Sequence, residues 1–278
     1  MRARLLTCIL LFLCGTSLSA QSLRSDRFEE RAFSLGGGVT NLLDTYLSPL
    51  TYRGGHVAIM DERFAQLSTK SGRWFGLSLF ALHGDYTTPL TENGLTVGGM
   101  ADYSYTYYYR FSLKSKQWSF YEGPQEQLRI GGIYNLRNSN NPAQLKLDLN
   151  LAISAMAKYT FTLWNTPMNV RIQTDLPLFG VAFAPNYGQS YYEIFYLGQD
   201  KGTTHITSLH NNLSLRANAS YDVLLKSCTV RLTLANDLYQ WSLGSQHYRM
   251  FTHTIMLGYV KDLYHVMRDE EVKRLIPY

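Results

Sequence analysis

The 278-residue sequence has few cysteines and no long hydrophobic run. The cysteines are Cys8, Cys14 and Cys228, and the most apolar stretch, residues 5–13, is much shorter than the about 20 residues that a membrane-spanning helix needs. The mean hydropathy of -0.18 fits a chain without such helices. These absences exclude a helical membrane protein, and they leave too few cysteines for a disulfide-rich fold.

Charge is sparse and does not cluster. The chain has 26 basic and 21 acidic residues, for a net charge of +5, and no basic run or aromatic-interleaved basic patch stands out. Nucleic acid is therefore not an expected partner. Zinc-type Cys or His clusters, phosphate-binding glycine loops and nucleophile elbows are also missing from the sequence, so we expect no metal and no cofactor.

The N-terminus has the pattern of a secretory signal. Arg2 and Arg4 precede the apolar stretch, and small residues lead to a cleavage site after Ala20. The alternative is a lipoprotein signal processed at Cys14, which Leu13 disfavours because that site requires a small residue before the cysteine. We expect residues 1–20 to be removed, which leaves a single cysteine and no internal disulfide.

What the sequence does contain is strict alternation of apolar and polar residues. From 145 to 163 every odd position is apolar or aromatic, and most even positions are polar. A period of two indicates a β-strand with one face in an apolar medium and one in a wet medium. The run is much longer than the usual strand of about 5–6 residues. Since about 9–11 residues of a tilted strand cross the hydrocarbon, the run predicts a transmembrane strand.

Ten segments alternate in this way, and together they predict an all-β protein, an antiparallel up-and-down transmembrane β-barrel of about ten strands. The segments cover residues 33–40, 54–68, 73–83, 97–113, 128–137, 145–163, 170–175, 212–223, 230–234 and 251–259. Twelve strands would result if residues 178–197 formed a hairpin in the membrane. A soluble barrel or sandwich is the alternative, but its turn signals would recur every 8–12 residues, and several of these segments are too long for that.

The connections alternate in length, as they do between the short periplasmic turns and longer outer loops of outer-membrane barrels. Short turns are expected at residues 70–72, 114–116, 165–167 and 225–227. The outer set comprises longer connections at 41–52, 84–94 and 176–203, with turns at 139–142 and 244–246. The barrel would span residues 21–264, and residues 265–278 would form a periplasmic tail.

The signal end at residues 19–21, the aromatic ladder from Tyr103 to Phe111 and the barrel-length strands resemble a family of uncharacterised outer-membrane β-barrels of Gram-negative bacteria, known only as a domain of unknown function. The segment Gly258–Tyr264 also resembles the strand-end signal read by the barrel-assembly machinery. The resemblance implies residence in the cell outer membrane, contact with its lipids, and the assembly machinery as a partner during biogenesis. It implies no catalytic residue.

Charged residues fall on the face of the strands that would line the lumen. They are Lys146, Asp148, Lys158, Arg171, Asp175, Arg216, Asp222 and Arg231. Side chains fill an eight-stranded barrel, and ten strands are close to that size. Isolated buried charges are costly, so we expect the arginines to pair with the aspartates of neighbouring strands. The sequence thus favours a narrow or closed lumen.

One serine and histidine pair raises the alternative of a lipid acyl hydrolase. Ser208 and His210 are two residues apart, but the alternation of residues 212–223, continued back to them, turns both toward the lumen and away from lipid. We therefore expect no catalytic residue. His253 faces outward between Phe251 and Ile255, without a nucleophile.

The connection at 176–203 is rich in aromatic residues and is the best candidate for a contact surface. The candidate contacts are Tyr187, Tyr191, Tyr192, Phe195 and Tyr196. The same residues could instead belong to extended strands and an interfacial aromatic girdle. The expected function is a narrow channel or a structural and interaction barrel, and the alternatives are a lipid-modifying hydrolase or a surface adhesin or secretion-assembly component. The sequence names no solute or protein partner.

Overall fold

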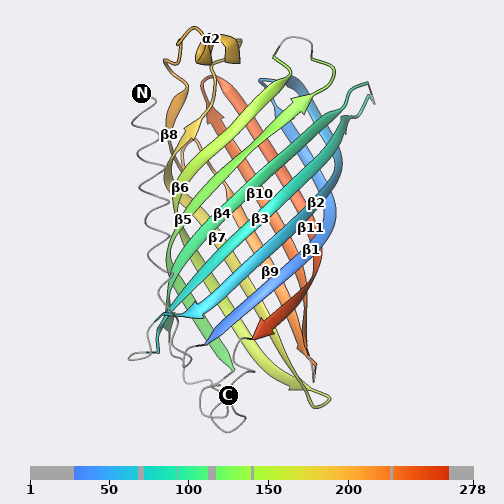
Figure 1. Cartoon of the computed structure of the whole chain (residues 1–278), viewed down its shortest axis with the longest axis vertical. Helices are drawn as coiled ribbons and strands as arrows, with labels where there is room; N and C mark the ends of the chain where they lie inside the picture. The colour runs from blue at the N-terminus through green and yellow to red at the C-terminus, as the bar shows by residue number, and fades with distance from the viewer. Residues whose placement is uncertain are drawn as a thin grey trace.

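A computed structural model describes residues 28–67, 72–91, 93–111, 117–138, 141–225 and 228–262. In these ranges ten wall positions close into an antiparallel barrel, with one short additional strand (Figure 1). The elements are β1 (Glu29–Asp44), β2 (Ser48–Gln66), β3 (Trp74–Pro89), β4 (Thr96–Phe111), β5 (Trp118–Asn135), β6 (Ala143–Leu163), β7 (Thr166–Phe183), α2 (Tyr191–Phe195), β8 (Thr204–Ser208), β9 (Leu215–Leu224), β10 (Thr229–Leu243) and β11 (Gln246–Asp262). The expected signal at 1–20 and tail at 265–278 lie outside the described residues.

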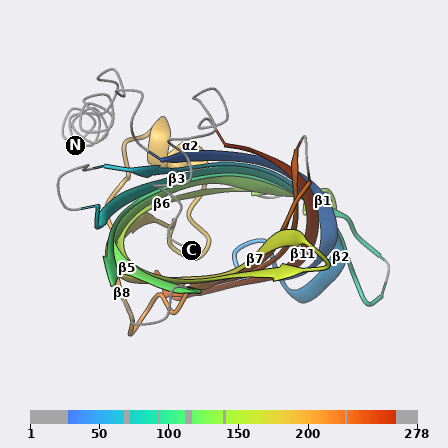
Figure 2. The same cartoon turned by 90° about the horizontal axis from the view of Figure 1, so that it is seen from below.

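The barrel closes between its first and last strands. Residues 30–44 of β1 pair antiparallel with residues 248–262 of β11 without a break in register. All other neighbours are consecutive in the chain, apart from the insertion of β8. The predicted all-β, antiparallel up-and-down barrel of about ten strands is confirmed. Viewed along its axis, the barrel has a flattened cross-section (Figure 2).

One wall position is divided between two strands. Both β8 and β9 pair antiparallel with β7, β8 with residues 179–183 and β9 with residues 168–175. Residues 209–214 interrupt the wall, and within them Asn212 forms only an isolated bridge to Trp241. The prediction that residues 212–223 form one strand is therefore wrong at its start. The amides of Asn211 and Asn212 both donate to the carbonyl of Ser208, which closes a turn there instead.

Three predicted long connections are shorter than expected. Residues 45–47 alone join β1 to β2, β3 continues to Pro89, and β7 continues to Phe183. Some glycines of these longer strands lie where two backbones approach closely. A Cβ atom on Gly54, for example, would lie 1.9 Å from the carbonyl oxygen of Tyr86 in β3. The hairpin over 178–197 that would have given twelve strands does not form, since β7 ends at Phe183 and Ser190 caps the single-turn helix α2 there.

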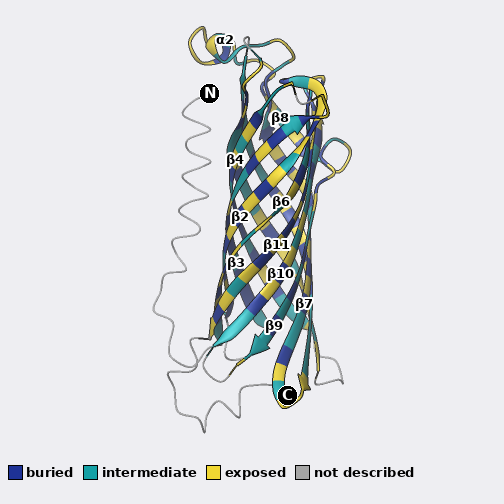
Figure 3. Cartoon of the chain, turned by 90° about the vertical axis from the view of Figure 1, so that its right-hand side faces the viewer, coloured by how far each residue is buried: buried dark blue, intermediate teal, exposed yellow. Residues whose placement is uncertain are grey.

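Buried and exposed residues alternate along the strands (Figure 3). The outer face of the barrel exposes large apolar side chains along every long strand, among them Leu35, Val57, Leu151, Ile172 and Leu257. The end of the barrel opposite α2, called the lower end here, carries outward-facing aromatic residues: Trp74, Tyr107, Tyr109, Phe111, Trp118, Phe120, Tyr159 and Phe161. Many charged and polar side chains are buried within. In the described ranges no helix is long and apolar enough to cross a membrane.

Candidate functional site

Side chains fill the lumen in layers. An apolar layer lies near the upper end, beside α2, and includes Leu42, Tyr52, Trp241, Tyr248 and Met250. A second, largely aromatic layer lies toward the lower end and contains Phe64, Phe75, Leu77, Tyr108, Tyr121 and Met156. Polar and charged side chains fill much of the space between them. Two cavities lie in this space, one of about 20 Å³ lined mainly by polar and charged side chains and one of about 30 Å³ lined largely by apolar side chains such as Met60 and Leu79, with room for about one or two water molecules each.

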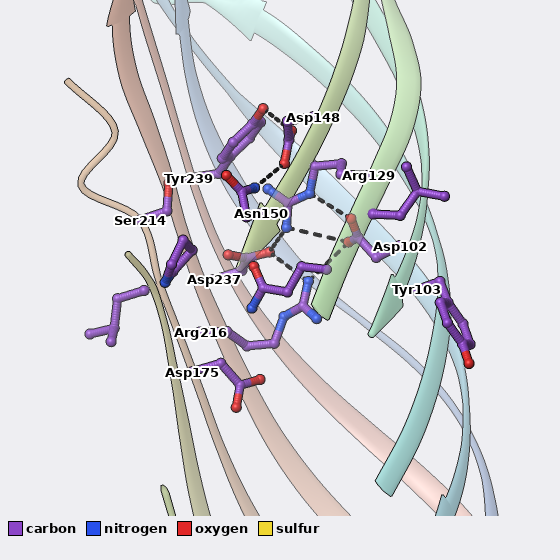
Figure 4. A pocket seen from close by; sticks show the side chains of 14 residues that line it. Asp102, Tyr103, Arg129, Asp148, Asn150, Asp175, Ser214, Arg216, Asp237 and Tyr239 are labelled. Carbon is purple, nitrogen blue, oxygen red and sulfur yellow. Dashed lines mark hydrogen bonds and ion pairs between the residues drawn. The ribbon is translucent and has the colours of Figure 1, made fainter. Parts of the chain in front are cut away.

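The middle of the lumen holds a network of two arginines and two aspartates (Figure 4). Arg129 Nε donates to Asp102 Oδ1 at 2.5 Å, and Arg129 Nη2 donates to Asp237 Oδ2 at 2.7 Å. Arg216 Nη2 lies 3.1 Å from Asp102 Oδ2 and 3.5 Å from Asp237 Oδ2. His83 Nε2 lies 2.7 Å from Asp102 Oδ2. The four charges come from β4, β5, β9 and β10, so the network joins opposite walls of the barrel.

A second network lies closer to the lower end, around Arg231. Its guanidinium contacts Asp222 on the adjacent strand at 2.6 Å, Glu62 on β2 at 2.8 Å and Glu30 on β1 at 2.5 Å. Arg171 Nη2 donates to the other oxygen of Glu62 at 2.6 Å. The side chain of Arg231 is only 1% exposed, so these carboxylates replace the water that would otherwise solvate it.

Lys146 forms a third polar contact, at the level of the upper apolar layer. Its Nζ lies 2.9 Å from Asp44 Oδ2, and it is 3.6 Å from the ring centroid of Tyr248 and 4.6 Å from that of Trp241. The ammonium is therefore held by one carboxylate and two aromatic faces. Together with Gln144, which donates to Gln246 at 3.0 Å, this contact ties β6 to β1 and β11.

All eight lumen residues that the sequence singled out lie on the inner face, and only some of them pair with aspartates of neighbouring strands. Arg231 pairs with Asp222 and Arg216 with Asp237 in this way, whereas Arg171 pairs with Glu62, and Arg216 also with Asp102, across the lumen. Of the remaining members, Lys158 lies 3.6 Å from Glu30, and Asp148 accepts from Tyr239 and Asn150. Asp175 accepts from Ser154, which is opposite it on β6, and from Gln173. The flattened cross-section brings opposite walls within reach of a side chain.

Sequence reasoning missed half of the network. The missing members are Glu30, Asp44, Glu62, Asp102, Arg129 and Asp237. The alternation contained a signal for two of them, since Asp102 shares the polar face of Ser104 and Thr106, and Arg129 that of Asn135. Glu62 belongs to the segment whose alternation was weakest. Glu30, Asp44 and Asp237 lie beyond the segment bounds assigned from sequence.

The predicted lumen position of Ser208 and His210 is wrong. In β8 the odd residue Thr207 is buried, whereas in β9 the even residues Asn218 and Ser220 are buried. The interruption at 209–214 therefore reverses the alternation, and Ser208 and His210 lie at the outer surface near the upper end. Ser208 Oγ is 2.5 Å from His210 Nδ1. In the described part of the chain no carboxylate is hydrogen-bonded to this histidine.

The loop of residues 184–203 folds back over the upper end of the barrel. Tyr191 is half-buried and its hydroxyl accepts from the amide of Leu145 at 2.6 Å, while Tyr46 donates to the carbonyl of Gln189 at 2.8 Å. Tyr192 and Tyr196 stack with ring centroids 4.8 Å apart. Of the five candidate contacts, Tyr191 holds the loop to the barrel, and Tyr187, Tyr192, Phe195 and Tyr196 are exposed.

A capping box fixes the helix in this loop. Ser190 Oγ accepts from the amide of Glu193 at 3.2 Å, and the amide of Ser190 donates to Glu193 Oε2 at 2.7 Å. This backbone N–H, followed by the Ser190 hydroxyl, lowers the pKa of Glu193. Within the described residues no group of three or more His, Cys, Asp or Glu side chains is placed to hold a metal ion.

Comparison with known proteins places the chain in a family and gives distant structural similarities. The family described as "Protein of unknown function (DUF3316)" matches residues 4–270. No curated protein matches the sequence.

Solved structures similar to this chain include three barrels of low sequence identity. The outer membrane protease OmpT from Escherichia coli is 9% identical over 88% of this chain and 100% of its own, with a TM-score of 0.47. The translocator domain of autotransporter NalP from Neisseria meningitidis is 8% identical over 91% and 94%, with a TM-score of 0.36. The attachment invasion locus protein Ail of Yersinia pestis is 10% identical over 84% and 98%, with a TM-score of 0.31. These similarities carry no information about a substrate or partner of this chain.

Proposed function

The chain belongs to the family of proteins of unknown function DUF3316, and from that premise we propose that it is an integral outer-membrane β-barrel with a closed lumen. It serves as a structural and interaction barrel and not as an open diffusion channel. The single observation that carries this proposal is the filled lumen, in which the charged side chains pair across the bore between two apolar layers.

The distribution of polarity supports residence in a membrane. Exposed apolar side chains cover the strands on the outside, while buried charges lie inside, which is the reverse of a soluble protein. Outward aromatic residues gather at the lower end, as in the interfacial girdles of membrane barrels. A barrel can cross a membrane because closure leaves no strand edge unpaired. The expected signal at residues 1–20 supports export to the outer membrane.

The interaction surface in this proposal is the loop of residues 184–203. Tyr46 and Tyr191 anchor it to the barrel, and Ser190 caps its helix, so its exposed aromatic side chains are held in place. Ordered exposed aromatic groups lose little conformational entropy on binding. This favours contact with another protein at the cell surface, as an adhesin or secretion-assembly component would make.

Single-channel recording in planar bilayers tests the closed lumen. We expect the purified, folded protein to pass little current. Replacing Trp241 and Tyr248 by alanine removes the centre of the upper layer and is expected to raise the leak. The matched control replaces the outward-facing Tyr259, which is 51% exposed, and should leave the current unchanged. A large, stable conductance from the unmodified protein would refute the closed lumen.

A lipid acyl hydrolase is the second candidate, favoured by the outward position of Ser208 beside His210 at 2.5 Å. In such a reaction the serine oxygen would attack an ester carbonyl while the histidine takes its proton. The ester bond would then break as the histidine gives that proton to the departing alcohol, and water would hydrolyse the acyl-serine to a free fatty acid and the original serine. Hydrolysis of a phospholipid that is lost in Ser208→Ala and retained in Ser242→Ala would support it. The control is well matched because Ser242 is also exposed and lies 3.0 Å from a histidine, His247. Equal, background-level hydrolysis by both variants and the unmodified protein would rule it out.

A further inference from the structure

The outer face of the barrel near its upper end contains an open groove with a volume of about 320 Å³. It lies over β1 and its two neighbours, and its lining includes Asn41, Leu43, Thr51, Arg53, Arg249 and Phe251. A second groove of about 290 Å³ shares Leu43 and Arg249 with the first and extends to His247. The two grooves form one continuous surface, called the rim groove here.

Two arginines flank the rim groove from opposite sides. In the sheet register Arg53 of β2 lies opposite Asn41 of β1, and Arg249 of β11 lies opposite Leu43 of β1. Adjacent strands are about 4.8 Å apart and the two positions are offset by two residues of about 3.3 Å each along β1, so the two arginine backbones stand about 12 Å apart with one strand between them. Both side chains are exposed, so both guanidinium groups can reach a single ligand above β1.

These arginines differ from the outward-facing arginines of the lower end. There, Arg31 Nε lies 3.0 Å from Asp61 Oδ1, and Arg63 Nε lies 2.7 Å from Glu29 Oε1. In the described part of the chain neither Arg53 nor Arg249 has a carboxylate partner, and the closest charge-related contact of Arg249 is the ring of Phe251 at 5.7 Å. Arg31 and Arg63 are thus neutralised within the protein, whereas Arg53 and Arg249 keep the rim groove positively charged.

The rim groove also lies where a lipid headgroup would be expected, near the upper end of the barrel and above exposed apolar side chains. Arg249 is four residues from Ser245 in the β10–β11 turn, so it lies close to the upper end. Below it the same strands expose Val39, Val57 and Ile255, which are 54%, 61% and 61% exposed. A ligand with acyl chains against these residues would place its polar head between the two arginines.

We propose that the rim groove binds the phosphate of a phosphorylated lipid in the membrane leaflet around the upper end. Arginine is suited to this role because its planar fork donates two parallel hydrogen bonds to a phosphate. Asn41, Thr51 and His247 provide further donors beside the guanidinium groups. The inference rests on the proposed membrane location, and it adds a specific lipid ligand to a barrel that otherwise contacts lipid only through apolar side chains.

Native mass spectrometry of the full chain in detergent tests the proposal, with bisphosphorylated lipid A as the probe. We expect the unmodified protein to retain the lipid and the Arg53→Ala/Arg249→Ala variant to bind it about tenfold more weakly or less. Arg31→Ala/Arg63→Ala is the matched control, and it should bind like the unmodified protein. Heat-modifiable gel mobility establishes that each variant is folded.

Two further ligands show whether the lipid phosphate, the acyl chains or any free phosphate accounts for the binding. Dephosphorylated lipid A should bind weakly, and inorganic phosphate alone should not compete at concentrations that match the lipid. Equal binding of the dephosphorylated lipid, effective competition by inorganic phosphate, or unchanged binding by the Arg53→Ala/Arg249→Ala variant would each overturn the proposal. Failure of the protein to fractionate with the outer membrane would instead refute the proposed function, so the two failures are distinguishable.

Discussion

Arg231 is a buried lumen arginine that forms ion pairs with three carboxylates. One guanidinium faces Glu30, Glu62 and Asp222, and the side chain is almost completely buried. Removing one partner of a buried ion pair costs more than the pair contributes, because a buried charge then lacks both water and a counter-ion. Truncating Arg231 would remove a counter-ion from three buried carboxylates at once.

We predict that Arg231→Ala lowers the free energy of unfolding by about 3–5 kcal/mol. Arg31→Ala is the control, since Arg31 pairs with Asp61 on the outer surface and is 63% exposed; its loss should cost less than about 1 kcal/mol. Urea unfolding of both variants in lipid vesicles, followed by tryptophan fluorescence, measures the difference. If both variants lost the same free energy of unfolding, the buried ion pairs of Arg231 would be no more important for stability than the exposed pair of Arg31.

Glu193 gives the outer loop a dependence on pH. Its pKa is lowered by the Ser190 backbone N–H and hydroxyl, so the carboxylate form stabilises the folded loop. This stabilisation is complete above the ordinary glutamate pKa of about 4.3 and disappears as the pH falls through the lowered pKa of the folded loop.

We expect the amides of α2 to lose hydrogen-exchange protection on acidification, after correction for intrinsic exchange rates. In Glu193→Gln the side-chain carbonyl can still accept from the Ser190 amide, and it does not titrate. The variant should therefore show protection that is independent of pH over the same range. If the α2 amides of the unmodified protein and of Glu193→Gln lost the same protection on acidification, the capping box would not be the cause of the pH dependence.

At the scale of the strands, the seam between β1 and β11 depends on glycine. A Cβ atom on Gly38 would lie 1.8 Å from the carbonyl oxygen of His253, whereas one on Gly37 would meet nothing closer than 3.4 Å. The two strands can approach at this point only because Gly38 lacks a side chain.

We predict that Gly38→Ala weakens closure of the barrel, at a cost of about 1–3 kcal/mol for the backbone shift that it forces. Gly37→Ala is a control one residue away, which should stay within about 0.5 kcal/mol of the unmodified protein. The midpoint of heat-induced loss of the fast-migrating folded form on gels gives both values. A Gly37→Ala variant as unstable as Gly38→Ala would argue against the close backbone approach.

The strands themselves could be predicted from sequence, and their interruptions could not. Alternation places Leu151 outward and Ser154 inward because one face of each strand meets lipid-like surroundings and the other the lumen. Between β8 and β9, however, a turn around Asn211 and Asn212 shifts the alternation by one residue. Extrapolating the β9 pattern backwards therefore put Ser208 on the wrong face.

The candidate site was predictable in part for a related reason. Alternation tells which charges enter the lumen, but not which opposite-wall residue each one meets. Arg171 finds Glu62, 109 positions away in the chain, because the barrel is flattened, and no local pattern encodes that distance. Arg231 and Asp222 were identifiable as partners because they lie opposite each other on adjacent strands.

At the scale of the whole molecule, the exposed apolar side chains on the outer face of the strands decide whether the barrel inserts into a membrane. Leu151 is near the middle of β6 and 59% exposed, whereas Leu90 is in the β3–β4 turn at the upper end and 78% exposed. We predict that Leu151→Arg destabilises the inserted barrel by about 2–4 kcal/mol and Leu90→Arg by about 0–1 kcal/mol. Folding yield into lipid vesicles measures both.

Both substitutions in this prediction change outward-facing residues, because a lumen residue such as Ser154 could not accommodate an arginine. Ser154 is completely buried, 2.5 Å from both Tyr108 and Asp175, so an arginine there would disrupt packing whatever the surroundings of the barrel. If Leu90→Arg impaired insertion as strongly as Leu151→Arg, the position of the membrane relative to β6 would have to be revised.

The ion pairs in the lumen also affect how long the folded barrel persists. Arg231 lies 201 residues from Glu30 and 169 from Glu62 in the chain, so these pairs can form only when the first and last strands have met. Contacts between such distant parts of a chain are costly to bring together and form late in folding. Contacts absent from the transition state do little for the folding rate and mainly slow unfolding. The lumen network therefore gives the barrel kinetic stability, a long lifetime once closed.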